Sequence, residues 1–470
     1  MNVSLYSLGA AQEVTGSKHI FEIDGRSFMV DCGAFQGKRK EADEKNRRFD
    51  IAADKLEALI LTHAHFDHCG LVPLLVKKGF RGNIYSTPAT RDLANLIMMD
   101  SARIQARDAE YLQKQAAKKK ESFTWKPLFN EKDVVLTANQ FVALSYKRKM
   151  YIAPDVELEF FDAGHILGSA IAMVTIKNQK GGDIRIAYTG DLGRKNKAII
   201  RDPDTDIPAP DYVFLESTYG NRLHENSDIA MDELEKVVRK AVASKGKVII
   251  PAFAIERTQE LVYYFHLLVD KKRIPEIPIY VDSPMATNAT SIFQIHPECY
   301  DEETFNAFLT HHKNPFGFNA LSFITSVDES KLLNKKSGPM IIISADGMCE
   351  AGRVVHHLAN NISQSENTVL IVGYMAENTL GRRILDGEKE VRIMGDWYKV
   401  NADICHIDAF SAHADYAECK EWLDSIDTSR LKKIFMVHGE KGVQETFLGY
   451  LNANGYKDVQ IVKYGETYSV

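Results

Sequence analysis

The segment Leu59–Leu74, LILTHAHFDHCGLVPL, constrains the fold of this chain more than any other. It begins with three apolar residues typical of a buried strand, and the apolar run that starts at Leu71 indicates a helix. The residues between them include three histidines and one aspartate: His63, His65, Asp67 and His68. This polar cluster is therefore predicted at the end of a strand and the start of a helix, where α/β proteins usually place their sites.

The spacing within the cluster predicts metal binding. His63 and His65 are two residues apart, so in an extended chain their side chains point to the same side. Asp67 and His68 follow a turn and are expected to face a second, neighbouring point. Imidazole and carboxylate ligands suit zinc, iron or manganese. The alternative is a polar loop with scattered histidines, but fifteen histidines in 470 residues would rarely fall so close together.

Length and composition predict a globular protein of two or three domains. The chain has 470 residues, 45% of them hydrophobic and 26% charged, which is ordinary for such a protein. No apolar run approaches the ~20 residues that span a bilayer, and the N-terminus lacks the pattern of a signal peptide. We therefore expect a cytoplasmic protein without a membrane partner. None of the six cysteines forms a C-x-x-C pair, so a cysteine-based zinc site is not expected.

Further polar residues lie at or just after the ends of predicted strands elsewhere in the chain. They are Asp31, His165, Asp191, Glu216, His413 and His438. Asp31 either caps its own loop or orients a metal-ligating histidine. A lone histidine such as His165 is more often structural, but the first metal still needs a third ligand. Asp191 carries a carboxylate able to bridge two cations.

Residues 101–150 form a basic stretch in a chain whose net charge is −6. They contain 11 Lys and Arg against 5 Asp and Glu, which gives 11 − 5 = +6. Aromatic residues are interleaved with these charges: Phe123, Trp125, Phe129 and Tyr146. Such a charge pattern is usually a solvated helical face. The alternative is a surface that follows a chain of phosphates.

Residues 221 to about 400 alternate predicted strands and helices, which indicates a parallel sheet. Several of the strand ends lead into helix N-termini, which are natural phosphate sites. Ser344, Arg353 and His357 are therefore candidates for contacts with RNA phosphates. Helix capping or surface charge is the alternative for each of them.

Taken together, these motifs resemble those of the metallo-β-lactamase superfamily. The first four motifs are matched by Asp31, by His63-x-His65-x-Asp67-His68, by His165 and by Asp191. Glu216, the stretch Ser411–Asp415 and the stretch Val437–Glu440 resemble the three motifs of the β-CASP subgroup, whose members are nucleases acting on RNA or DNA. The likeness is greatest to the branch that contains the endonuclease subunit of the cleavage and polyadenylation specificity factor and its bacterial ribonuclease relatives.

The resemblance implies an α/β fold with an inserted domain. Residues 1–217 and 401–470 would together form an αββα metallo-β-lactamase sandwich. Residues 218–400 would form an inserted α/β β-CASP domain with a parallel sheet. Only the resemblance predicts that the two outer segments belong to one domain.

The resemblance also implies a role for each site residue. One zinc ion would be held by His63, His65 and His165, and a second by Asp67, His68 and His438. Asp191 would bridge the two ions and Asp31 would support their ligands. His413 would be the general acid, held by Glu216. Manganese or iron could take the place of the two zinc ions.

The implied function is a zinc-dependent ribonuclease that hydrolyses phosphodiester bonds of single-stranded RNA. A water activated by two metals would attack phosphorus, Asp67 would hydrogen-bond that water, and His413 would protonate the leaving oxygen. The absence of a recognisable additional RNA-binding module favours an endonuclease, and leaves a homodimer open. The alternatives are a small-molecule hydrolase of the thioesterase or lactonase type and a non-catalytic RNA-processing scaffold.

Overall fold

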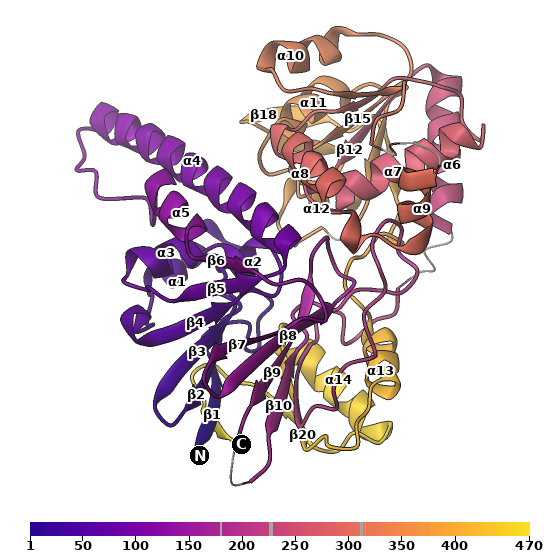
Figure 1. Cartoon of the computed structure of the whole chain (residues 1–470). Helices are drawn as coiled ribbons and strands as arrows, with labels where there is room; N and C mark the ends of the chain where they lie inside the picture. The colour runs from indigo at the N-terminus through magenta and orange to yellow at the C-terminus, as the bar shows by residue number, and fades with distance from the viewer. Residues whose placement is uncertain (179–180, 225–228, 311–313, 315, 374) are drawn as a thin grey trace. The chain divides into compact units, whose positions relative to one another are not determined.

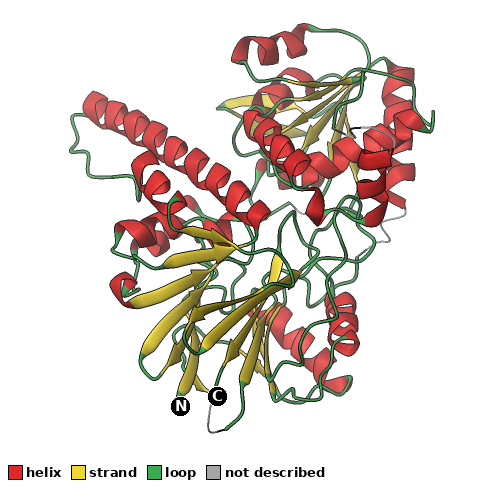
Figure 2. Ribbon diagram, in the orientation of Figure 1, coloured by secondary structure: helices red, strands yellow, loops and turns green. Residues whose placement is uncertain are grey.

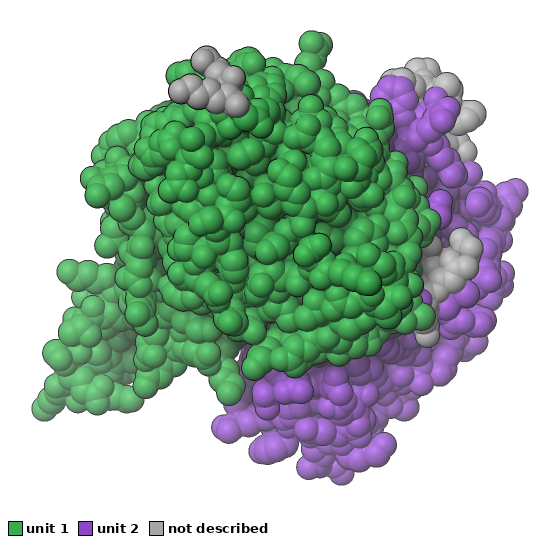
Figure 3. Space-filling view, turned by 90° about the horizontal axis from the view of Figure 1, so that it is seen from below, with its two compact units in different colours: residues 1–195, 202–223, 413–470 green, residues 196–201, 224–412 purple. Residues whose placement is uncertain are grey.

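The structure is a computed structural model that describes all residues except 179–180, 225–228, 311–313, 315 and 374. The chain divides into two compact units, coloured separately in Figure 3. Unit 1 comprises Met1–Lys195, Asp202–Leu223 and His413–Val470, and unit 2 comprises Asn196–Arg201 and His224–Ala412. The histidine cluster therefore lies in unit 1.

The first sheet of unit 1 brings the N-terminal strands together with the last strand of the chain. Its order is β22-β1-β2-β3-β4-β5-β6. β1, β2 and β3 pair antiparallel, whereas β3, β4, β5 and β6 run parallel. The carboxyl ends of β3 and β4, which precede Asp31 and His63, therefore meet at one edge. The bounds are β1 Val3–Ser7, β2 His19–Ile23, β3 Arg26–Val30, β4 Leu56–Ile60, β5 Asn83–Ser86, β6 Phe141–Ala143 and β22 Tyr468–Ser469.

The second sheet of unit 1 has the order β21-β20-β11-β10-β9-β8-β7. β10, β11 and β20 run parallel, with Glu216 opposite Val437. Asp191, Glu216 and His438 therefore come to the same edge, although the last two are far apart in sequence. The bounds are β7 Lys149–Ala153, β8 Val156–Asp162, β9 Ala170–Ile176, β10 Ile184–Tyr188, β11 Tyr212–Glu216, β20 Lys433–Val437 and β21 Val459–Ile461.

The two sheets pack face to face, with helices outside them (Figure 2). Buried side chains from both sheets, such as Phe21 and Phe214, form one core between them, and Trp422 and Phe447 from α13 and α14 belong to a second core. The predicted αββα sandwich is confirmed. Its helices are α1 Arg39–Arg47, η1 Ala53–Lys55, α2 Phe66–Cys69, α3 Val72–Lys77, α4 Pro88–Lys119, α5 Glu131–Ala138, α13 Tyr416–Ser425 and α14 Lys441–Ala453.

The sheet of unit 2 is entirely parallel, as the alternation of strands and helices predicted, and has the order β14-β13-β15-β12-β16-β19. A separate hairpin, β17 Glu390–Ile393 and β18 Asp396–Lys399, packs its apolar face on the core of this unit. The other strands are β12 Lys247–Pro251, β13 Ile279–Val281, β14 Leu321–Phe323, β15 Met340–Ser344, β16 Thr368–Ile371 and β19 Asp403–His406. The helices are α6 Ile229–Ser244, α7 Arg257–Asp270, α8 Pro284–Ile295, η2 Pro297–Cys299, α9 Glu302–Thr310, α10 Val327–Lys335, α11 Val354–Asn361 and α12 Leu380–Leu385 (Figure 1).

Candidate metal centre

The carboxylate of Asp191 stands between two groups of imidazoles in unit 1. Its Oδ2 lies 3.3 Å from Nε2 of His63, 3.5 Å from Nε2 of His165 and 4.0 Å from Nδ1 of His65. Asp191 follows β10, while the histidines come from loops after β4 and β8. Four predicted ligands from three separate loops thus converge on one point.

The other oxygen of Asp191 faces the second group. Oδ1 lies 3.3 Å from Nε2 of His68 and 3.5 Å from Nδ1 of His438. Oδ2 of Asp67 lies 3.5 Å from Nε2 of His438. Asp191 therefore offers one oxygen to each group, which is the arrangement that a bridging ligand requires.

The donor atoms of these residues fit metal ions. Within each of two groups, the ligand atoms lie within 4.8 Å of one another; the groups are His63, His65, His165 and Asp191, and Asp67, His68 and His438. Nε2 of His63 and Oδ1 of Asp191 are buried and have no hydrogen-bond partner among the described residues. Buried polar atoms are normally bonded. Buried imidazole and carboxylate atoms without a hydrogen-bond partner suit the binding of zinc, manganese or iron. The assignment of each residue as a ligand stays a prediction.

Burial and charge set the protonation of two of these residues. Burial, together with the nearby His68, lowers the pKa of His63 to about 3, which keeps its imidazole neutral. Burial opposes the ionisation of Asp191, but the surrounding histidines, His438 first, hold its pKa well below the usual range. A neutral imidazole and an ionised carboxylate are the forms that bind metals.

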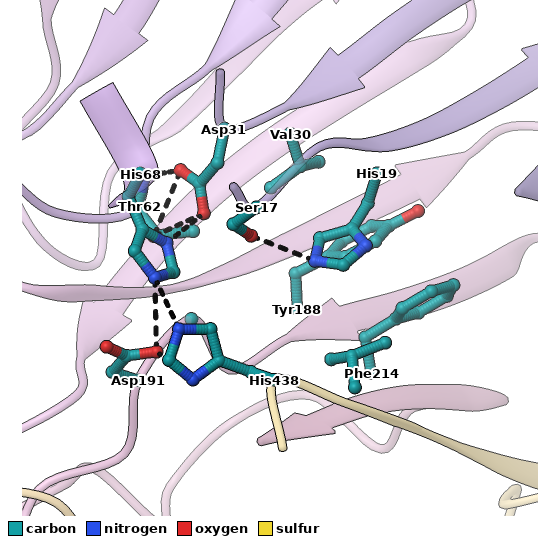
Figure 4. Close-up of a pocket in the computed structure, with 12 residues that line it drawn as sticks. Ser17, His19, Val30, Asp31, Thr62, His68, Tyr188, Asp191, Phe214 and His438 are labelled. Atoms are coloured by element: carbon teal, nitrogen blue, oxygen red, sulfur yellow. Dashed lines mark hydrogen bonds and ion pairs between the residues drawn. The ribbon is translucent and has the colours of Figure 1, made fainter. Parts of the chain in front are cut away.

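Asp31 lies next to His68, a member of the second group. Its Oδ2 accepts a hydrogen bond from Nδ1 of His68 at 2.8 Å (Figure 4). Nδ1 of His68 donates to this carboxylate, and Nε2 on the other side of the ring faces Asp191. The backbone N–H and the hydroxyl of Thr62 also donate to Asp31. Gly33 lets this loop approach the His68 segment, since a Cβ there would meet the carbonyl oxygen of Asp67 at 1.5 Å.

His413 and Glu216 form a third group beside Asp191. Nδ1 of His413 lies 3.1 Å and 3.2 Å from the two carboxylate oxygens of Glu216, and 3.9 Å from Oδ2 of Asp191. Burial alone would lower the pKa of His413, but the charge and hydrogen bond of Glu216 outweigh it and raise the pKa to about 9. Glu216 is fully buried and also accepts the backbone N–H of Leu192 at 2.7 Å. This raised pKa favours the protonated form of the His413 imidazole at neutral pH.

Two supporting threonines were missed by the sequence analysis. Thr218 Oγ1 lies 3.0 Å from Nδ1 of His438. In the same way, the hydroxyl of Thr62 hydrogen-bonds the carboxylate of Asp31. Each hydroxyl stands within two residues of a predicted site residue, and this proximity was the available signal. His19 was also not predicted; it lies in the wall of a small cavity next to the centre, hydrogen-bonded to Ser17 (Figure 4).

The three candidates for RNA contacts in unit 2 all have intramolecular partners. Ser344 is buried and donates to the backbone oxygen of Asp282 at 2.9 Å. His357 is fully buried, with Nε2 at 2.6 Å from Oδ2 of Asp282. Nη1 of Arg353 donates to Oδ1 of the same aspartate at 2.6 Å. These contacts give each residue a role inside the fold, and their binding of RNA stays a prediction.

Comparison with known proteins decides the family. Residues 19–168 match the metallo-beta-lactamase superfamily, residues 258–384 match the Beta-Casp domain, and residues 397–462 match the Zn-dependent metallo-hydrolase RNA specificity domain. Ribonuclease TTHA0252 of Thermus thermophilus is 33% identical over 97% of this chain and 98% of its own length. The chain belongs to the β-CASP family of the metallo-β-lactamase superfamily. The resemblance is confirmed, and this β-CASP protein is a metal-dependent hydrolase of the nuclease class.

Other relatives agree with this assignment. Transcription termination factor FttA of Methanosarcina mazei is 30% identical to the β-CASP protein over 93% of this chain and 67% of its own length. A crystal structure of a protein of unknown function from Enterococcus faecalis has a TM-score of 0.57 and 11% identity, and the match covers all of both chains. That likeness supports the fold alone. No helix in the described part of the chain is long and apolar enough to cross a membrane.

Proposed function

We propose that this protein is a zinc-dependent endoribonuclease that hydrolyses phosphodiester bonds in single-stranded RNA. Its metal ions would be held by His63, His65 and His165 on one side and by Asp67, His68 and His438 on the other, with Asp191 between them. Bound there, two metal ions supply a nucleophile from water at neutral pH and neutralise charge on the phosphate. Manganese or iron in place of zinc is consistent with the same donors.

The observation that carries the proposal is the pair His413–Glu216 beside Asp191. Hydrolysis of a phosphodiester releases an alkoxide-like oxygen, which needs a proton. His413 is protonated, partly exposed, and held by a fully buried carboxylate at 3.1 Å. It donates its proton to the leaving oxygen, while Asp67 accepts a hydrogen bond from the attacking water. A thioesterase releases a thiolate, which is a good leaving group and does not need such an acid.

Relatives support RNA as the substrate. One is named a ribonuclease, and residues 397–462 match an RNA specificity domain. The domain boundaries at residues 217 and 400, a cytoplasmic location and a homodimer also remain predictions.

The test is incubation of the metal-loaded protein with three labelled substrates: a single-stranded RNA with a blocked 5′ end, a DNA of the same sequence, and a thioester. We expect internal cuts in the RNA, which a 5′-exonuclease cannot make on a blocked end. Shortening from one end only would overturn the endonuclease mode. Turnover of the thioester with intact RNA would overturn the nuclease proposal in favour of a small-molecule hydrolase.

A further inference from the structure

The second half of α4 leaves the core of unit 1. The buried residues of this helix, among them Leu93 and Met98, all lie between Ala89 and Ala102, and none follows Ala102. The helix runs from Pro88 to Lys119 and ends in left-handed Lys120. Residues 103–119 therefore form about four and a half turns of helix that contribute no buried side chain.

One face of this exposed half carries an ordered set of side chains, which we call the α4 stripe. Its members follow one another at steps of four, four, three and four residues, so they share one face of the helix. They are Arg103, Arg107, Tyr111, Lys114 and Lys118, and all are exposed. Tyr111, at the centre, is 62% exposed. The stripe is about 22 Å long, from 15 residues at ~1.5 Å each.

The charges of the stripe are largely free of carboxylate partners. Among the described residues, Arg107, Lys114 and Lys118 have no carboxylate within 4.0 Å, and Arg103 has an exposed contact of 3.4 Å with Glu131. Asp108, on the same helix, is paired with Arg39 instead. Three of the four cations of the stripe thus have no carboxylate partner among the described residues, in a chain whose net charge is −6.

The first turn of α4 is bound to the loop that carries His165. The hydroxyls of Thr87 and Thr90 both donate to the backbone oxygen of Gly168 at 2.7 Å. A Cβ at Gly168 would lie 2.7 Å from the backbone nitrogen of Thr90, so the contact is close. The stripe starts at Arg103, 15 residues after the first residue of α4. It therefore begins about 22 Å along the helix axis from the loop that carries His165.

We propose that the α4 stripe binds the single-stranded RNA substrate a few nucleotides away from the bond that is cut. Cations spaced along one face bind successive phosphates, and an exposed aromatic ring between them stacks on a base. Every charge in the stripe is positive, which matches a chain of phosphates. A protein partner would not require such a row. The inference rests on the proposed function, because it assumes that the substrate is RNA.

The charges are tested with Arg107→Glu/Lys114→Glu, against Lys55→Glu/Lys457→Glu as a control with the same change of net charge at exposed positions of unit 1. With an RNA of about 30 nucleotides, we expect the stripe variant to raise KM about tenfold with little change in kcat. With an RNA of about 4 nucleotides, too short to reach the stripe, KM should not change. The slope of log KM against log salt should fall by about 1.4, the value for two lost phosphate contacts.

The stacking is tested with Tyr111→Ala against Tyr151→Ala, since Tyr151 is 59% exposed elsewhere in unit 1. We expect only Tyr111→Ala to raise KM for the long RNA, by about fivefold or more. If the stripe variants match their controls while the wild type cleaves RNA, the stripe is a solvated helix face and this inference alone is overturned. If the wild type neither binds nor cleaves RNA, the proposed function falls and the inference falls with it.

Discussion

Nδ1 of His413 lies 3.1 Å from the buried carboxylate of Glu216, the last residue of β11, almost two hundred residues earlier in the chain. The pair stands beside Asp191, whose two oxygens face the two groups of imidazoles. A proton donor is thus held next to the candidate metal centre without belonging to either of its histidine groups. This separation lets the acid and the metal ligands be tested independently.

Replacing the acid should lower the rate without removing metal. We expect His413→Ala to reduce kcat on RNA by about 10²–10⁴, the usual contribution of one acid–base group. Metal content, measured by atomic emission, should match that of the wild type. His356→Ala, at an exposed histidine of α11, is the control. Normal RNA turnover by His413→Ala would remove this residue from the mechanism.

The charge of Glu216 should set the alkaline limit of activity. The pKa of His413 is raised to about 9, so the protonated acid persists at neutral pH and is lost as pH rises through that value. In Glu216→Gln the negative charge is gone while burial remains, and burial lowers the pKa of a histidine. We expect the alkaline limb of the kcat profile to move to lower pH. An unmoved limb would show that another group titrates there.

Removing the central carboxylate should remove metal as well as activity. Asp191→Ala deletes the carboxylate whose two oxygens face the two groups of candidate ligands. We expect a large loss of bound metal, measured after dialysis against a weak chelator. Asp31→Asn, which alters only the support of His68, should weaken metal binding about 10–100-fold. Two tight ions per chain in Asp191→Ala would contradict the bridging role.

Arg353→Ala distinguishes a structural role from RNA contact in unit 2. The arginine neutralises Asp282, which is fully buried. Because His357 still contacts Asp282, the variant loses one hydrogen bond to a charged group, about 1.5–3 kcal/mol, so we expect a lower free energy of unfolding in urea and an unchanged KM for RNA. Arg382→Ala, at a surface pair with Asp386, should cost at most about 1 kcal/mol. A raised KM with unchanged stability would instead support phosphate binding by Arg353.

Local patterns were sufficient to predict many of the strands and helices and to single out candidate metal ligands. Strands such as β4 and β20 are short apolar runs, and the polar residues that follow them are visible at the next positions. His63, His65, Asp67 and His68 lie so close together in the sequence that their spacing alone indicates metal ligands. Predictions of this kind depend only on neighbours within a few residues, where periodicity and ligand chemistry operate.

Only the tertiary structure decided how these residues meet, because contacts between distant segments leave no periodic trace in the sequence. His68 and His438 are 370 positions apart, and it is the parallel pairing of β11 with β20 that brings His438 to the edge where Glu216 lies. The same holds for Thr218 against His438. The burial of Ser344 and His357, and the extension of α4 beyond the core, likewise depend on which surfaces the fold covers.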